Sequence, residues 1–187
     1  MKRVRDEIDR LDSEIAALLM RRLEMASVAG RLKKDVLDQK REREVLAKVA
    51  LMTGPQVGGL IGEGVYPAIF DTSRGIQSSG FKLGGFPASG GERGEMAVRK
   101  YDARALPVLF DDTRLMRDLC AAGCLDFAVV PLGDAPLTAM DGLVVAATFS
   151  KKAKGAPSDC RGFAVVVPDG EPSSAKSSKR GRRGGKA

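Results

Sequence analysis

The sequence of 187 residues contains no histidine and no tryptophan, and aromatic residues make up only 5% of it. Without histidine, the chain lacks the commonest general base, the usual partner of a nucleophilic serine or cysteine, and most zinc sites. Its three cysteines are an odd number, and no apolar block of the signal-peptide type opens the sequence. We therefore expect reduced thiols and a cytoplasmic protein. Cys120 and Cys124, four residues apart on a predicted helix, are expected to be small buried residues, with a metal or redox role as the alternative.

The positive charge is concentrated at one end of the chain. The net charge is +7, and residues 172–187 hold six cations and no acid. Without those six cations the remainder carries only +1, so the basic character belongs to the tail. We expect this tail to be disordered and solvated. Binding of nucleic acid or of an acidic protein is the alternative, although no aromatic residue is interleaved to stack bases. No run is long and apolar enough to span a membrane, so we expect no membrane partner.

A helical run over residues 5–33 is the most informative segment. Apolar residues recur in it at helical spacing, and neither proline nor glycine interrupts it before Gly30. These residues are Ile8, Leu11, Ile15, Leu18, Met25 and Leu32. At 1.5 Å per residue the helix is about 43 Å long, which is more than one small domain covers. The run therefore predicts that a second copy of the chain packs against it.

Three cations of this run indicate a shared site. Arg22 and Lys33 are eleven residues apart, which puts them within about 20° of each other around the helix. Arg5 lies about 25 Å from Arg22 along the axis. It can meet the other two cations only if the second copy runs antiparallel. The segment thus predicts a homodimer in which Arg5 serves the partner's site.

The rest of the sequence predicts two further helices and then a small α/β layer. We expect the second helix at residues 38–52, capped by Asp38 and stopped by Thr53-Gly54-Pro55. We expect the third helix at residues 57–77. It is weakened by four glycines and by Pro67, so we expect a kink or fraying there. The α/β layer is predicted from strands at 81–83, 106–110, 125–130, 143–149 and 163–167 and from helices at 95–101 and 112–122.

Polar residues on the three helices form one coherent set. Arg22 and Lys33 share a face of the first helix, and the other two helices each add a group at helical spacing. The second helix contributes Asp38, Arg41 and Glu42, and the third contributes Ser73 and Gln77. The set has many cations, an amide and no nucleophile with a partner base. It suits the binding of a small dianion better than acid-base or covalent catalysis, and a solvated charged face is the alternative.

Four motifs in this order resemble the all-helical chorismate mutases. They are RDEIDRLD (5–12), LLMRRLEMASVAGRLK (18–33), DQKRERE (38–44) and IFDTSRGIQ (69–77). The resemblance covers residues 1–78 and implies a three-helix domain that forms an intertwined all-α dimer. It also implies an isomerase that converts chorismate to prephenate in aromatic amino-acid biosynthesis, with no cofactor and no metal. Isochorismate pyruvate lyase on the same fold is one alternative. A non-enzymatic protein of the shikimate pathway, which binds ligands or regulates, is another.

The resemblance also implies a role for each residue of the set. Arg22, and Arg5 from the partner, pair with the two carboxylates of chorismate, and Ser73 adds a carboxylate contact. Lys33 and Gln77 hydrogen-bond the ether oxygen. The ring hydroxyl is held by Glu42 with help from Asp38, and Arg41 supports the site electrostatically. Of these residues, Lys33, Gln77, Arg22 and Glu42 are expected to be catalytic.

The second half resembles a reduced prephenate dehydratase domain. Residues 81–101 are similar to the strand, glycine-rich turn and helix that begin that domain, and residues 109–132 to its helix-strand unit. The motif that carries the family's catalytic threonine is here Cys160-Arg161-Gly162-Phe163, so we expect no dehydratase activity. A phosphate loop at residues 84–94 is the alternative, but it lacks the Gly-Lys-Ser/Thr ending. The predicted division is a helical domain at 1–78, a linker and first strand at 79–94, an α/β domain at 95–170, and a tail at 171–187.

Overall fold

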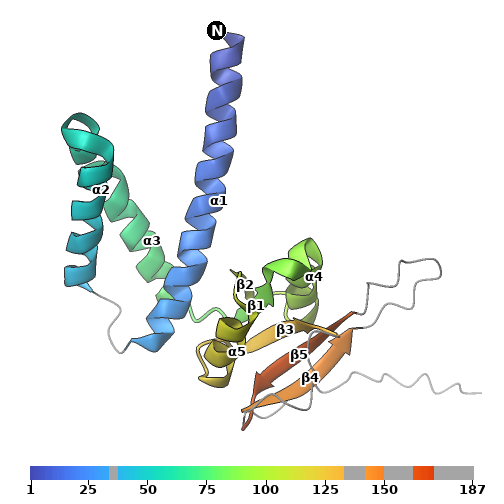
Figure 1. Ribbon diagram of the computed structural model, residues 1–187. Coiled ribbons are helices and arrows are strands. Elements are labelled where there is room, and N and C mark those ends of the chain that lie inside the picture. Colours follow the sequence, from blue (N-terminus) through green and yellow to red (C-terminus); the bar gives the residue numbers. More distant parts are fainter. Residues whose placement is uncertain (34–37, 133–141, 150–161, 171–187) are drawn as a thin grey trace, which may run out of the picture.

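The computed structural model describes residues 1–33, 38–132, 142–149 and 162–170, and it contains a helical region followed by an α/β region (Figure 1). The helical region consists of α1 (Lys2–Leu32), α2 (Gln39–Gly59), the π-helix η1 (Leu60–Val65) and α3 (Tyr66–Ser78). The α/β region consists of β1 (Leu83–Pro87), the short 3₁₀ helix η2 (Ala88–Gly90), α4 (Gly91–Tyr101), β2 (Leu106–Phe110), α5 (Thr113–Ala121), β3 (Phe127–Pro131), β4 (Leu143–Phe149) and β5 (Phe163–Pro168).

The prediction of one long first helix is confirmed by α1, which has 31 residues. The α2–η1–α3 segment lies on one side of its C-terminal half and the α/β region on the other (Figure 1). The N-terminal half projects beyond both, and its apolar residues are exposed. The exposed fractions are 64% for Val4, 50% for Ile8, 43% for Leu11, 53% for Ile15 and 69% for Leu18. One copy of the chain therefore leaves half of this helix without an apolar partner.

The predicted cap of the second helix is confirmed, because the Asp38 side chain accepts a hydrogen bond from the backbone N–H of Arg41. The predicted stop at residues 53–55 is a kink instead. Gly54 has φ 72° and ψ 170°, which is outside the helical region, and the helix then resumes. The predicted third helix is divided among the end of α2, η1 and α3. Pro67 lies in the first turn of α3, a position that tolerates proline.

The five strands form one mixed sheet in the order β2-β1-β3-β5-β4. β1, β2 and β3 are parallel, whereas β5 is antiparallel to both β3 and β4. The first strand was predicted at residues 81–83, but it spans Leu83–Pro87 and is interior to the sheet. The shift has a packing cause. A Cβ atom at Gly84 would be 2.6 Å from the Phe127 ring, and one at Gly85 would be 2.8 Å from Leu125. These glycines make room for core side chains and are not linker residues.

Both faces of the sheet are covered. Phe86, Val98, Phe127, Val129 and Val165 belong to the apolar cluster on the α4 side. The cluster on the α5 side also contains Val28, a residue of α1 that is only 4% exposed. The helical region thus contributes a side chain to the core of the α/β region.

The remaining predictions have mixed outcomes. Cys120 and Cys124 are buried, as predicted. The other predicted helices and strands correspond to α4, β2, α5, β3, β4 and β5, with ends that differ by up to four residues. Cys160, Arg161 and the basic tail lie outside the described residues, and the division into domains stays a prediction. None of the helices in the described ranges has a segment of the length and apolar character needed to cross a membrane.

Candidate functional site

A pocket of about 350 Å³ lies between α1, α2 and α3. Its lining includes seven of the eight residues predicted for the site, and these come from all three helices. They are Arg22, Lys33, Asp38, Arg41, Glu42, Ser73 and Gln77. The eighth, Arg5, is exposed near the start of α1 and does not line the pocket. Residues 55 positions apart in sequence, such as Arg22 and Gln77, therefore share one cavity.

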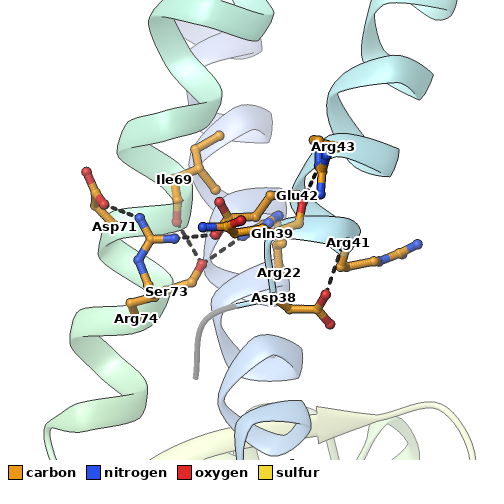
Figure 2. A network of polar contacts seen from close by, with 10 residues as sticks. All are labelled: Arg22, Asp38, Gln39, Arg41, Glu42, Arg43, Ile69, Asp71, Ser73 and Arg74. Atoms are coloured by element: carbon orange, nitrogen blue, oxygen red, sulfur yellow. Dashed lines mark hydrogen bonds and ion pairs between the residues drawn. The ribbon is translucent and has the colours of Figure 1, made fainter. Parts of the chain in front are cut away.

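Arg22 is held in the pocket by contacts with α3. Its Nη1 atom donates a hydrogen bond of 2.8 Å to the hydroxyl of Ser73 (Figure 2). Ser73 in turn donates to the carbonyl of Ile69 at 2.7 Å and is only 7% exposed. The guanidinium carbon of Arg22 lies 5.5 Å from the centre of the Phe70 ring, within range of a cation–π contact. A hydroxyl and a ring thus orient the guanidinium and leave its other N–H donors for a ligand.

Lys33 and Asp38 close the end of the pocket. The Lys33 ammonium is ion-paired with Asp38, whose other carboxylate oxygen accepts the Arg41 backbone N–H at 3.0 Å. The hydrogen bond from Lys33, followed by that from Arg41, lowers the pKa of the Asp38 carboxyl. Lys33 is the first residue after α1 and has an extended backbone. Its position therefore depends on how firmly the last turn of α1 is held.

Gln77 reaches across from α3 to α1. Its Nε2 atom donates a hydrogen bond of 2.7 Å to the backbone carbonyl of Ala26. The primary amide has a second N–H and a carbonyl oxygen, which remain for a ligand in the pocket.

Arg74 is a site residue that sequence reasoning missed. It lines the pocket and is ion-paired with both Glu42 on α2 and Asp71 on α3 (Figure 2). A signal was present, because Arg74 precedes Gln77 by three residues and so shares its side of α3. Arg41 also lines the pocket, and its guanidinium pairs with Glu44 at 3.3 Å.

The charges of the pocket favour an anion. Its lining has four cations, Arg22, Lys33, Arg41 and Arg74, and two carboxylates, Asp38 and Glu42, so two positive charges are in excess. Two of the cations, Lys33 and Arg74, are already paired with the two carboxylates. The arrangement can bind a small dianion through fixed donors, and its acids can accept hydrogen bonds from a hydroxyl.

Residues 4–78 match the family model for chorismate mutase type II. The match covers α1, α2, η1 and α3, and it includes every residue of the predicted site. The helical region is thus a chorismate mutase type II domain, and a mixed α/β region follows it. No curated protein and no solved structure matched the chain. The resemblance of the α/β region to prephenate dehydratase therefore stays a prediction.

Proposed function

We propose that the chain is a chorismate mutase, an isomerase that converts chorismate to prephenate. The proposal is supported by the family match over residues 4–78 and by the charge of the pocket. The observation that carries it is the convergence of seven predicted residues from three helices on one cavity.

Chorismate has two carboxylates, and the proposed site offers a cation to each. Arg22 binds one of them, because its guanidinium can form two parallel hydrogen bonds with a carboxylate. Ser73, already bonded to Arg22, adds a contact to the same group. Arg5 of a second subunit binds the other carboxylate.

The rearrangement breaks a carbon–oxygen bond and develops negative charge on the ether oxygen. Lys33 and Gln77 donate hydrogen bonds to that oxygen, and these bonds become stronger as the charge grows. Glu42, assisted by Asp38, accepts a hydrogen bond from the ring hydroxyl, and Arg41 adds positive potential. No proton is transferred and no cofactor takes part, so a pocket without histidine is sufficient. The catalytic effect comes from holding the compact conformer and from fixed charges.

The proposal includes a homodimer. Arg5 lies about 25 Å along α1 from Arg22, so it cannot serve the pocket of its own chain. The exposed apolar residues of the N-terminal half, such as Leu11 and Ile15, offer the contact surface for a second copy. In an antiparallel arrangement of two α1 helices, each N-terminal half meets the other subunit's pocket.

The decisive experiment is a spectrophotometric assay of chorismate loss with identification of the product. We expect the full chain to form prephenate, and Arg22→Ala to lower kcat/KM by at least about 100-fold, as expected for loss of a charged anchor. Arg43→Ala is the matched control, because Arg43 is an exposed arginine of α2 outside the pocket. Normal turnover by Arg22→Ala would overturn the site. Release of pyruvate from isochorismate, with no prephenate formed from chorismate, would assign the lyase reaction instead, and a chain inert to chorismate would overturn the mutase function.

For the α/β region we propose no dehydratase activity, because the chain has Cys160-Arg161-Gly162-Phe163 at the position of the motif that carries the family's catalytic threonine. Prephenate incubated with the full chain is expected to persist. Loss of prephenate above the rate in buffer would contradict this. We also propose that the chain is located in the cytoplasm.

A further inference from the structure

The C-terminal half of α1 has two functional faces. Arg22 and Arg31 are nine residues apart, so they lie about half a turn from each other around the helix. Arg22 faces the pocket. Arg31 faces the α/β region, where its guanidinium is ion-paired with Asp126 at 2.7 Å. The same turns of one helix therefore belong to the proposed mutase site and to the contact with the sheet.

The last turn of α1 is attached to the sheet by a compact set of polar contacts. Besides the ion pair, Arg31 donates a hydrogen bond of 2.8 Å to the backbone carbonyl of Phe81. Asp126 is fixed as well, because it accepts the backbone N–H of Leu83, the first residue of β1, at 2.7 Å. The side chains of Arg31 and Asp126 are only 30% and 21% exposed. The end of the helix is thus connected through Asp126 to the interior of the sheet.

A second attachment lies about 10–15 Å away along the helix, at Arg21 and Glu24. Arg21 donates to the backbone carbonyl of Leu109 in β2, and Glu24 accepts the backbone N–H of the same residue at 3.3 Å. Between the two attachments, Val28 is buried in the core cluster of the α/β region. The sheet therefore holds α1 at both ends of the segment that lines the pocket.

The attachment at Arg31 matters because helix ends fray. The last carbonyls of a helix have no partner within it, and Lys33 follows the final helical residue directly. We infer that Arg31 and Asp126 are positioning residues for Lys33, and that the α/β region serves catalysis by holding this end of α1. The inference rests on the proposed function, because Lys33 has a catalytic role only if the pocket turns over chorismate.

The test compares Arg31→Gln and Asp126→Asn with the unaltered full chain. Lys33 is proposed to act on the ether oxygen in the transition state, so misplacing it should lower kcat about tenfold and leave KM nearly unchanged. Arg31→Lys, which keeps the positive charge, should lower kcat less than Arg31→Gln does. In a Lys33→Gln background, Arg31→Gln should cause no further loss, because the group it positions is already gone. Arg99→Gln is the control, since Arg99 forms an ion pair of 2.9 Å with Glu95 within α4 and does not attach α1 to the sheet.

Amide hydrogen exchange provides a readout besides activity. Arg31→Gln should speed exchange at residues 29–33, whereas Arg99→Gln should not. The inference is overturned if Arg31→Gln leaves kcat within about twofold of that of the unaltered chain. It is also overturned if Arg31→Gln lowers kcat by the same factor in the Lys33→Gln background as in the unaltered chain. Either result leaves the mutase function standing. A full chain that never turns over chorismate would overturn the function. The exchange rates would then still decide whether Arg31 and Asp126 hold the end of α1.

Discussion

Gln77 of α3 lies directly against Gly30 of α1. A Cβ atom added to Gly30 would be 2.8 Å from both Cγ and Cδ of Gln77, closer than such atoms approach. Only a residue without a side chain lets the amide lie across α1 and bond to the Ala26 carbonyl. The single glycine inside this long helix is therefore part of the candidate site.

Gly30→Ala is expected to slow catalysis without weakening the fold. Alanine favours a helix over glycine by up to about 1 kcal/mol, and the flexible Gln77 side chain can move aside. Its displacement should lower kcat about tenfold, because a donor to the ether oxygen is misplaced. Gly75→Ala is the matched control, since a Cβ atom there meets nothing within 4 Å. Steady-state kinetics and thermal unfolding of both variants check the prediction, and equal kinetics for the two would contradict it.

Arg74 and Glu42 should act as one unit. Arg74 joins α2 to α3 through Glu42, so Arg74→Gln removes the fixed orientation of the acid, and Glu42→Gln removes the acid itself. Each is expected to lower kcat/KM about tenfold, and the double variant should be little worse than the more severe single one. The double-mutant cycle should give a coupling of about 1 kcal/mol. Asp71→Asn, which alters an exposed partner of Arg74, is the control. Additive losses would show that Arg74 acts independently of Glu42.

Mixing two inactive variants tests the shared site. In a mixed dimer of Arg5→Ala and Arg22→Ala chains, one of the two proposed pockets has both arginines. Random exchange of subunits should therefore restore about one quarter of the unaltered activity. Assays before and after mixing, with each variant alone as the control, measure this. A mixture that stays inactive, or a fully active monomer in light scattering, would contradict the proposed dimer.

Glu24 should give the stability a defined pH dependence. Burial raises the pKa of this carboxyl above its ordinary value of 4.5, against the opposing effects of the Leu109 N–H and Arg21. The folded state thus binds the proton more tightly than the unfolded state. The resulting stabilisation is complete at a pH below the ordinary pKa of the unfolded state, and it is lost as the pH rises through the raised pKa of the folded state. The free energy of unfolding of the unaltered chain, relative to Glu24→Gln, should therefore increase as the pH falls toward 4.5. Urea unfolding at several pH values checks this, with exposed Glu14→Gln as the control, and a relative decrease would contradict it.

The residues that line the pocket could be predicted because helical periodicity carries that information. Arg22 and Lys33 fall on one face by spacing alone, and the same holds for the group around Glu42 and the pair Ser73 and Gln77. Asp38 was predictable as a cap from its residue type and position.

Contacts that depend on tertiary structure could not be predicted in this way. Arg21, Glu24 and Arg31 fall on the polar side of α1, a pattern that fits a solvated face as well as a face that contacts a sheet. Gly84 and Gly85 fit a flexible linker equally well, and their role depends on Phe127 and Leu125, about forty residues later. Spacing along one helix contains no information about which distant backbone lies opposite.

The contact between α1 and Leu109 also bears on solubility. β2 is an edge strand of the sheet, and edge strands with free backbone groups recruit strands from other molecules. Arg21 and Glu24 occupy the carbonyl and the N–H of Leu109, so they compete with such pairing. Because α1 is synthesised before β2, the two side chains that give this protection already exist when the edge first forms. A fragment that begins after α3 would lose it and should self-associate through β2.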